Sequence, residues 1–249
     1  MSGNIRLRDQ KILCLKSGNR CAIPECRKLL VIEKTSRDKE SIIAEMPHIK
    51  GEKPKAPRYD KNMTDEERNS CDNLILVCRD HHKMIDDQPN TFKVEKLHQI
   101  KKEHAAWIQE NLDNQMVNVT FGELNVITKY LNANQPTLSE SYTLIPPKDK
   151  INRNNLSPST KHKIMTGMLQ VKKVEHYIDN YPDVEFGERL KQGFVTEYER
   201  LKNEENLSGD ELFNSLFAFA CRGSSDFREM AAGLAVLVYL FEKCEVFEK

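Results

Sequence analysis

Three cysteines and one histidine, in two widely separated groups, constrain this chain more than any other feature. Cys21 and Cys26 flank a short turn at Pro24, and His81 follows Cys78 after two intervening residues. Thiolates and imidazoles at such spacings are the ligands of tetrahedral zinc sites, although two unrelated buried thiols would also give the first pair. The presence of Cys78 and His81 downstream favours a metal site over two unrelated thiols. The sequence therefore predicts one structural Zn²⁺ ion bound by Cys21, Cys26, Cys78 and His81.

A zinc ion would also help the first part of the chain to fold, because residues 1–115 contain only short apolar runs. A domain of about 100 residues with two short strands has little core, and a bound metal supplies folding free energy. Apolar periodicity and turn residues predict these elements: a helix at 7–15, a strand at 42–47, a loop at 50–61, a helix capped at Thr64, a strand at 73–77, a helix at 78–85 and a long amphipathic helix at 92–112.

The helix at 78–85 carries two adjacent histidines that must point in different directions. Successive helical residues are rotated by about 100°, so Cys78 and His81 share a face while His82 is turned away from it. His82 can therefore serve a second site, and Asp86, one turn later, either orients its imidazole or lies in solvent. Together with His48, which directly follows the first strand, this stretch indicates a metal-dependent nuclease.

The order of strand, His48, loop, Asn73, strand and helix with His82 resembles the HNH nuclease superfamily in its zinc-stabilised form. The similarity extends over roughly residues 10–110. It implies an α+β fold, in which a zinc-stabilised ββα-metal HNH endonuclease domain at residues 1–115 is followed by an all-α helical domain.

The resemblance also implies a role for each residue. His48 would be the general base that activates water, and His82 would bind a catalytic divalent ion, which could be Mg²⁺, Mn²⁺, Ni²⁺ or Zn²⁺. Asn73 would orient the His48 imidazole or join the shell of the metal. His81 stands where relatives have a second cysteine, which leaves open an exchange of roles between His81 and His82. Pro47 stands where many relatives place an aspartate ligand, so the ligand set of the catalytic ion is open as well.

The loop at 50–61 is the best stretch for contacts with DNA phosphates, because it is rich in basic residues and proline. The candidate contacts are the side chains of Lys50, Lys53, Lys55 and Arg58, together with Lys83 on the next helix. For any one lysine, a simply solvated side chain is the alternative. The expected substrate is double-stranded DNA, cleaved with little sequence preference.

The second half of the chain lacks such clusters and reads as helical. We expect a linker arm at 116–158, whose first part, up to residue 135, passes into a helix, and a helical oligomerisation and docking domain at 159–249. Its last helix is apolar nearly all round from Met230 to Phe241 and must be buried. We expect it at a subunit or partner interface, in a homo-oligomer when active, with a central helix of a monomeric bundle as the alternative.

Four stretches of this half resemble the C-terminal domains of effectors in ABC-three-component, or Lamassu-type, anti-phage defence systems. They are residues 142–147, 150–156, 210–216 and 238–248. The resemblance implies two partners, an SMC-like ATPase and a small accessory subunit, which keep the effector silent until phage DNA is sensed.

The function expected from the whole chain is that of a defence endonuclease controlled through its C-terminal domain. Two alternatives are a non-catalytic zinc-dependent DNA-binding adaptor and an HNH nuclease gated by a nucleotide second messenger. The start of the chain shows no basic-then-apolar leader pattern, and the longest apolar run is too short to span a bilayer. We therefore expect a cytoplasmic protein without membrane contact.

Overall fold

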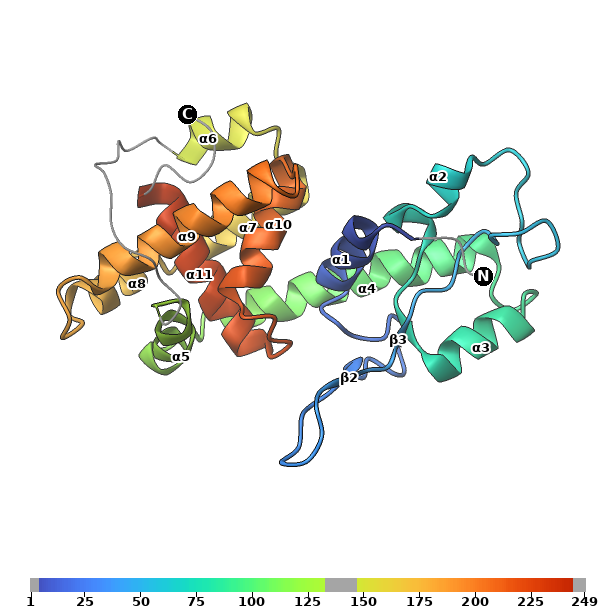
Figure 1. The fold of residues 1–249 in the computed structure, drawn as a ribbon, viewed down its shortest axis with the longest axis horizontal. Coiled ribbons are helices and arrows are strands. Elements are labelled where there is room, and N and C mark those ends of the chain that lie inside the picture. The colour runs from blue at the N-terminus through green and yellow to red at the C-terminus, as the bar shows by residue number, and fades with distance from the viewer. Residues whose placement is uncertain (1–4, 133–146, 244–249) are drawn as a thin grey trace. The chain divides into compact units, whose positions relative to one another are not determined.

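The structure is a computed structural model that describes residues 5–132 and 147–243. It is mixed, mostly helical with few short strands, and it divides into two compact units, Met1–Glu110 and Asn111–Lys249 (Figure 1). The division falls inside one long helix, α4 (Val94–Met116). Among the helices of the described ranges, none is long and apolar enough to cross a membrane.

The first unit contains short strands and helices that precede and include most of α4. They are α1 (Leu7–Lys16), β1 (Val31–Ile32), β2 (Ser41–Ile42), β3 (Ala44–Glu45), α2 (Asp65–Arg68), the 3₁₀ turn η1 (Cys71–Asn73), β4 (Val77–Cys78) and α3 (Arg79–Asp87). The predicted cap at Thr64 is confirmed, since its hydroxyl accepts the Glu67 amide and its own amide donates to the Glu67 carboxylate. Such a capping box contributes about 1 kcal/mol to helix stability.

Two antiparallel strand pairs organise this unit. β1 pairs with β2 in an exposed hairpin, which extends from the unit in Figure 1. β3 pairs with β4, with Ala44 opposite Cys78 and Glu45 opposite Val77. This ladder continues through a bridge between His48 and Leu74, so the whole stretch from 44 to 48 runs beside 74 to 78. Helix α3 begins directly where β4 ends.

The core of the first unit lies around the strand that leads into α3. Leu74, Ile75, Leu76 and Val77 are all buried, which explains why this stretch is continuously apolar instead of alternating. Residues of α1, α3 and α4 complete the cluster, among them Leu13, Ile85 and Leu97. The strand is thereby fixed on both faces, and α3 starts from a rigid base.

In the residues that the structure describes, the second unit is all helical. Its elements are the end of α4, α5 (Phe121–Asn132), α6 (Pro147–Arg153), α7 (Pro158–Met168), α8 (Val171–Asp179), α9 (Phe186–Asn203), α10 (Gly209–Ala220) and α11 (Phe227–Lys243). Helix α5 falls within the stretch expected to be a linker arm, 116–158, yet its Leu124, Ile127 and Leu131 are buried in the core of this unit. The linker prediction is therefore corrected for α5, whose apolar face is part of the bundle. The extended piece expected at 142–145 lies outside the described residues.

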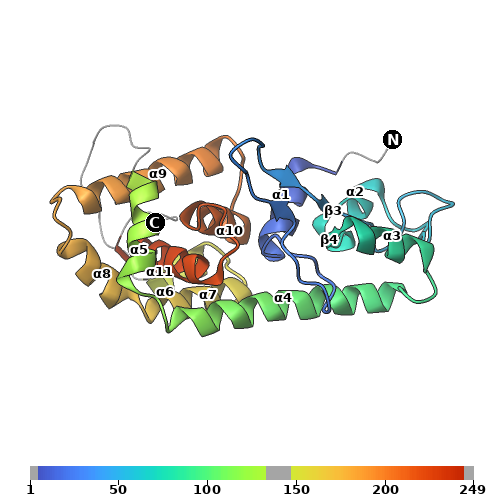
Figure 2. The same cartoon turned by 90° about the horizontal axis from the view of Figure 1, so that it is seen from below.

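Helix α11 is the central element of the second unit. It packs against α5, α7, α8 and α10 (Figure 2). The approach is close: a Cβ added to Gly167 of α7 would lie 2.6 Å from Val238, and one added to Gly233 of α11 would lie 2.9 Å from the Ala220 carbonyl oxygen. Its apolar surface is thus covered within the chain. The expectation that this helix needs a subunit interface is wrong, because α5 and the helices after it suffice to surround it.

Candidate functional site

The turn that carries the first two cysteines is shaped by its backbone. The amides of Cys26 and Arg27 both donate to the Ile23 carbonyl, at 3.0 and 3.2 Å, and Arg27 has a φ of 47°, in the left-handed region. The Cys21 amide donates to the Lys28 carbonyl, which joins the two ends of the turn. The Ala22 amide donates to the Leu76 carbonyl at 2.9 Å, which attaches the turn to the strand that ends at Cys78. Residues 21–26 are called the zinc turn below.

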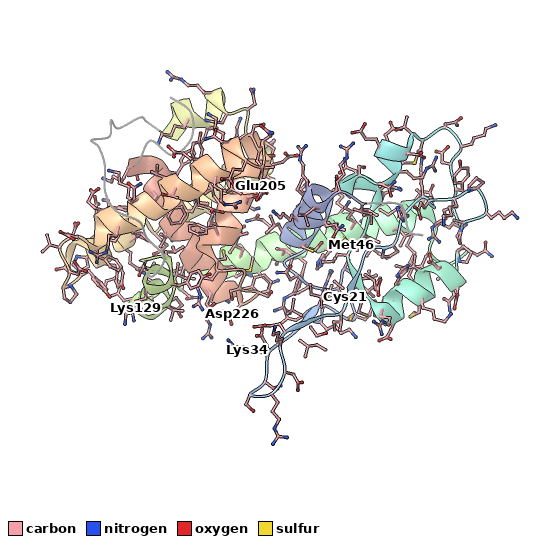
Figure 3. The ribbon with its side chains drawn as sticks, viewed as in Figure 1. Cys21, Lys34, Met46, Lys129, Glu205 and Asp226 are labelled. Atoms are coloured by element: carbon pink, nitrogen blue, oxygen red, sulfur yellow. The ribbon has the colours of Figure 1, made fainter. Side chains whose placement is uncertain are left out.

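The structure brings Cys21, Cys26, Cys78 and His81 together, as predicted. One ligand atom from each residue lies within 4.8 Å of all the others. Nδ1 of His81 is 3.1 Å from the Cys78 sulfur and 3.6 Å from the Cys21 sulfur. In a tetrahedral zinc site, sulfur and nitrogen ligands stand about 3.6 Å apart. The four residues therefore fit a metal such as zinc, and Cys21 is labelled in Figure 3.

Two of these thiols have opposite electrostatic surroundings. Burial raises the pKa of the Cys21 thiol to about 12. Burial acts in the same direction on Cys78, but the His81 backbone amide and the Lys28 ammonium outweigh it and lower the pKa of that thiol. A coordinated thiol is deprotonated, so metal uptake at this cluster would release protons. The Cys78 thiol therefore loses its proton more readily than an ordinary cysteine, whereas the Cys21 thiol would lose its proton only when a cation binds it.

Arg27 connects the zinc turn to α4. Its guanidinium donates to the Ala22 carbonyl at 2.8 Å and to Nδ1 of His104, and it lies over the ring of Trp107. The opposite nitrogen of His104 donates to the Ser17 carbonyl at 3.0 Å. Burial, and then the charge of Arg27, lower the pKa of His104 to about 4. His104 is therefore held as a neutral imidazole with its proton on Nε2.

His48 lies in a cleft of about 730 Å³ in the first unit. Its Nε2 is 3.1 Å from Oδ1 of Asn69, and Nδ2 of Asn69 donates to the Asp65 carbonyl at 3.0 Å. The second contact fixes the orientation of the amide, so Asn69 presents its oxygen to the histidine. A neutral His48 then carries its proton on Nε2 and its lone pair on Nδ1. Asn69 was not singled out in the sequence, where it is one polar residue in a polar segment.

The side chain of Asn73 forms hydrogen bonds with backbone groups, whereas we expected it to orient the His48 imidazole or to join the shell of the metal. Its Oδ1 accepts from the Lys50 amide at 2.9 Å, and its Nδ2 donates to the carbonyls of Lys50 and Arg68, at 2.8 and 2.9 Å. The expected contact with the His48 imidazole is made by Asn69 instead. Buried polar groups must be hydrogen-bonded, and the backbone of Lys50, which follows His48, and the Arg68 carbonyl together provide partners for both groups of this amide. Asn73 therefore holds the loop that follows His48.

His82 points into the same cleft between two carboxylates. Its Nδ1 is 3.5 Å from Glu45, and its Nε2 is 3.2 Å from Asp86. All three residues line the cleft with His48. Glu45 was missed in the sequence. The available signal was an acidic side chain in an apolar strand, two residues before Pro47 and therefore on the same face of that strand. A carboxylate therefore lies in this strand region beside His82, although not at position 47.

The rest of the cleft wall is formed by apolar and loop residues of the same unit. Helix α1 and the segment before it contribute Ile5 and Leu7, and the strand region contributes Ile42 and Met46, which is labelled in Figure 3. The titratable groups therefore lie at one side of a partly apolar hollow, where charge interactions are stronger than in bulk water.

The basic side chains expected to contact DNA fall into three groups. The side chain of Arg58 is only 6% exposed, and its guanidinium donates to the carbonyls of Ile49 and Ile85, at 2.8 and 3.0 Å, and to Asp86 at 3.4 Å. Its assignment as a phosphate contact is corrected, because its donors are used inside the protein. Lys50 pairs with Asp60 at 2.8 Å and Lys83 with Asp87 at 2.6 Å. Lys53 and Lys55 are exposed.

Comparison with known families decides the identity of the helical unit. Residues 123–248 match C-terminal domain 10 of the ABC-three component systems. The chain belongs to this family. As an ABC-three component protein it is a component of an anti-phage defence system that acts with partner subunits. The matched region begins on α5, in agreement with the place of that helix in the bundle. A comparison with curated proteins gave no match.

Proposed function

We propose that this ABC-three component protein is the nuclease effector of its system, with an HNH-type domain in the first unit that hydrolyses double-stranded DNA with little sequence preference. The observation that carries the proposal is the meeting of His48 and His82 in one cleft, with Glu45 and Asp86 on either side of His82. A general base, a metal-ligating imidazole and carboxylates are the groups that phosphodiester hydrolysis requires.

The local architecture supports this assignment. Two antiparallel strands, β3 and β4, lead directly into α3, which is the order of elements in a ββα-metal motif. His48 follows the first strand, and His82 lies on the helix. The Cys3His cluster lies between the start of α3 and the zinc turn, and zinc there would join the two and fix the helix that carries His82.

His48 would act as the general base. With its Nε2 proton directed to Asn69, its Nδ1 would take a proton from the attacking water. Asn69 would keep the imidazole in this tautomer, and Asn73 would keep the backbone after His48 in place. A divalent ion held at His82 would supply positive charge to the scissile phosphate and the leaving oxygen.

DNA would be held along the loop that borders the cleft. Gly51, Glu52, Ala56 and Pro57 of this loop line the cleft, and Lys53 and Lys55 project from the same loop. Arg58 and Arg68 fix the loop from inside, since Arg68 donates to the carbonyls of Asp60 and Met63, at 3.1 and 2.7 Å. The exposed lysines are thus carried by an ordered segment.

Partner subunits would bind the helical unit. Its surface exposes large apolar side chains, among them Met165 and Leu169 at the end of α7, which are 69% and 67% exposed. Residues four apart on a helix share a face, so these two form a small apolar surface suited to a protein partner. An SMC-like ATPase and a small accessory subunit are the partners proposed for it.

The test is cleavage of supercoiled plasmid by the full chain, alone and reconstituted with its partner subunits, in the presence of Mg²⁺, Mn²⁺, Ni²⁺ or Zn²⁺. We expect His48→Ala to lower the rate by about 10²–10⁴-fold, the usual contribution of a general base. His98→Ala is the matched control, because His98 is an exposed histidine of the same unit. DNA binding without cleavage, unaffected by His48→Ala, would instead identify a DNA-binding adaptor.

A further inference from the structure

The two nitrogens of His82 have different neighbours. Nε2 is 3.2 Å from Asp86, one turn along α3, while Nδ1 is 3.5 Å from Glu45 on β3. A neutral imidazole has one N–H and one lone pair, so it can donate to only one of these carboxylates. Which carboxylate accepts the proton decides which nitrogen is available to a cation.

The position of Arg58 indicates that Asp86 is the carboxylate that accepts the His82 proton. The Arg58 guanidinium is 3.4 Å from the other oxygen of Asp86, and it is held in place by two backbone carbonyls while almost completely buried. A cation bound to Asp86 would lie beside this fixed positive charge. Asp86 is therefore suited to accept the Nε2 proton of His82, which leaves the Nδ1 lone pair directed towards Glu45.

On the Glu45 side of the His82 ring, the neighbouring positive charge is exposed instead of buried. The competing positive charge there is Arg79, 3.9 Å from Glu45, and its side chain is 82% exposed. An exposed ion pair at that distance contributes little and can separate at small cost. A cation can therefore displace Arg79, whereas it cannot displace Arg58.

We propose that Glu45 and Nδ1 of His82 form a divalent cation site, with Asp86 as a positioning residue that is itself held by Arg58. A metal-binding histidine commonly donates its second nitrogen to a carboxylate, which fixes the ring and its tautomer. The proposal deepens the proposed nuclease function by assigning the ligands of its ion. It can be tested without measuring cleavage.

The experiment is a titration of the zinc-loaded full chain with Mn²⁺, in which free Mn²⁺ is measured by electron paramagnetic resonance. Glu45→Gln should weaken binding beyond the roughly 10–100-fold typical of outer-shell residues, and Asp86→Ala should weaken it within that range. Asp86→Asn, which keeps an acceptor oxygen, should recover part of the loss. Arg79→Gln should bind Mn²⁺ as tightly as wild type or more tightly.

Glu52→Gln is the matched control, because Glu52 lines the same cleft and its substitution removes the same charge. Zinc content and circular dichroism verify that each variant is folded. A second readout is the ¹⁵N spectrum of the histidines: His82 should carry its proton on Nε2 in the wild type, and Mn²⁺ should broaden its Nδ1 signal first. In Asp86→Ala the ring should lose its preference for one tautomer.

Two results would overturn the site: Mn²⁺ affinity unchanged in Glu45→Gln, or equal losses in Glu45→Gln and Glu52→Gln. Failure of the nuclease proposal has a different signature. If Mn²⁺ binds through Glu45 and His82 but the activated complex leaves plasmid intact, the cation site stands and the nuclease assignment falls. If plasmid is cut while Glu45→Gln binds Mn²⁺ normally, the nuclease assignment stands and the proposed cation site falls.

Discussion

The neutral state of His104 leads to a prediction about stability and pH. His104 is 2% exposed, with Nδ1 accepting from Arg27 and Nε2 donating to Ser17. Its pKa is about 4 in the folded protein, whereas an unfolded histidine titrates near ~6.5. Between these values the unfolded chain binds a proton that the folded chain refuses. Lowering the pH from about 6.5 to about 4 therefore removes stability from the first unit.

The size of the effect follows from the same pKa values. Each pH unit corresponds to about 1.4 kcal/mol, so the full loss is of the order of 3 kcal/mol. The perturbation is His104→Gln, since glutamine can accept from Arg27 and donate to Ser17 but does not titrate. Urea unfolding of wild type and variant at several pH values between 5 and 7.5 measures the difference. Protonation of the Cys3His cluster should affect both proteins alike and cancel in the comparison.

The expected result is that the wild-type free energy of unfolding falls more steeply with decreasing pH than that of the variant. Nuclear magnetic resonance should show the His104 ring neutral, with its proton on Nε2, throughout this range. Equal pH dependence of the two proteins, or a His104 ring that titrates near 6.5, would refute the argument that Arg27 and burial keep this ring uncharged.

Three further predictions concern the zinc cluster and the cleft. Cys26→Ala should remove one zinc ion per chain and unfold the first unit, since structural zinc supplies roughly 10 kcal/mol or more of folding free energy; a cooperative thermal transition with unchanged zinc content would contradict this. Asn69→Ala should lower the cleavage rate and alter its pH profile without changing DNA affinity, because His48 loses the acceptor for its Nε2 proton; an unchanged pH profile would exclude that role. Substitution of both Lys53 and Lys55 by Gln should reduce the slope of log Kd against log salt by about 1.8, as two lost phosphate contacts require, and an unchanged slope would place the DNA elsewhere.

Local spacing made the metal cluster predictable. Cys78 is the extended residue just before α3 and His81 lies in the first turn of that helix, so the two are close through a short stretch of chain, and the zinc turn closes on itself over six residues, from Cys21 to Cys26. Such features depend on the nearest residues and survive any arrangement of the rest of the chain. The same holds for the cap at Thr64, where donor and acceptor are three residues apart.

Features that depend on distant segments were not predictable in the same way. Arg58 looked like an exposed charge in a Pro- and Lys-rich loop, and only the return of that loop onto α3 buries it. The partner of Asn73 likewise depends on where the backbone of Lys50 lies. The burial of α11 likewise depends on how closely the helices of this unit pack, because the sequence shows that they are apolar but not that together they can enclose a central helix.

The adjacency of His81 and His82 has a consequence for how this stretch can vary. Because each residue turns the helix by about 100°, one inserted or deleted residue between Cys78 and His81 would change which imidazole faces the thiolates. A side-chain substitution changes one contact and can be compensated nearby, whereas a change of length would disrupt the zinc cluster and the cleft at once. The segment from Cys78 to Asp86 should therefore accept substitutions at its exposed positions but neither insertions nor deletions, and a scan of single-residue length variants should show an abrupt loss of folding at its start.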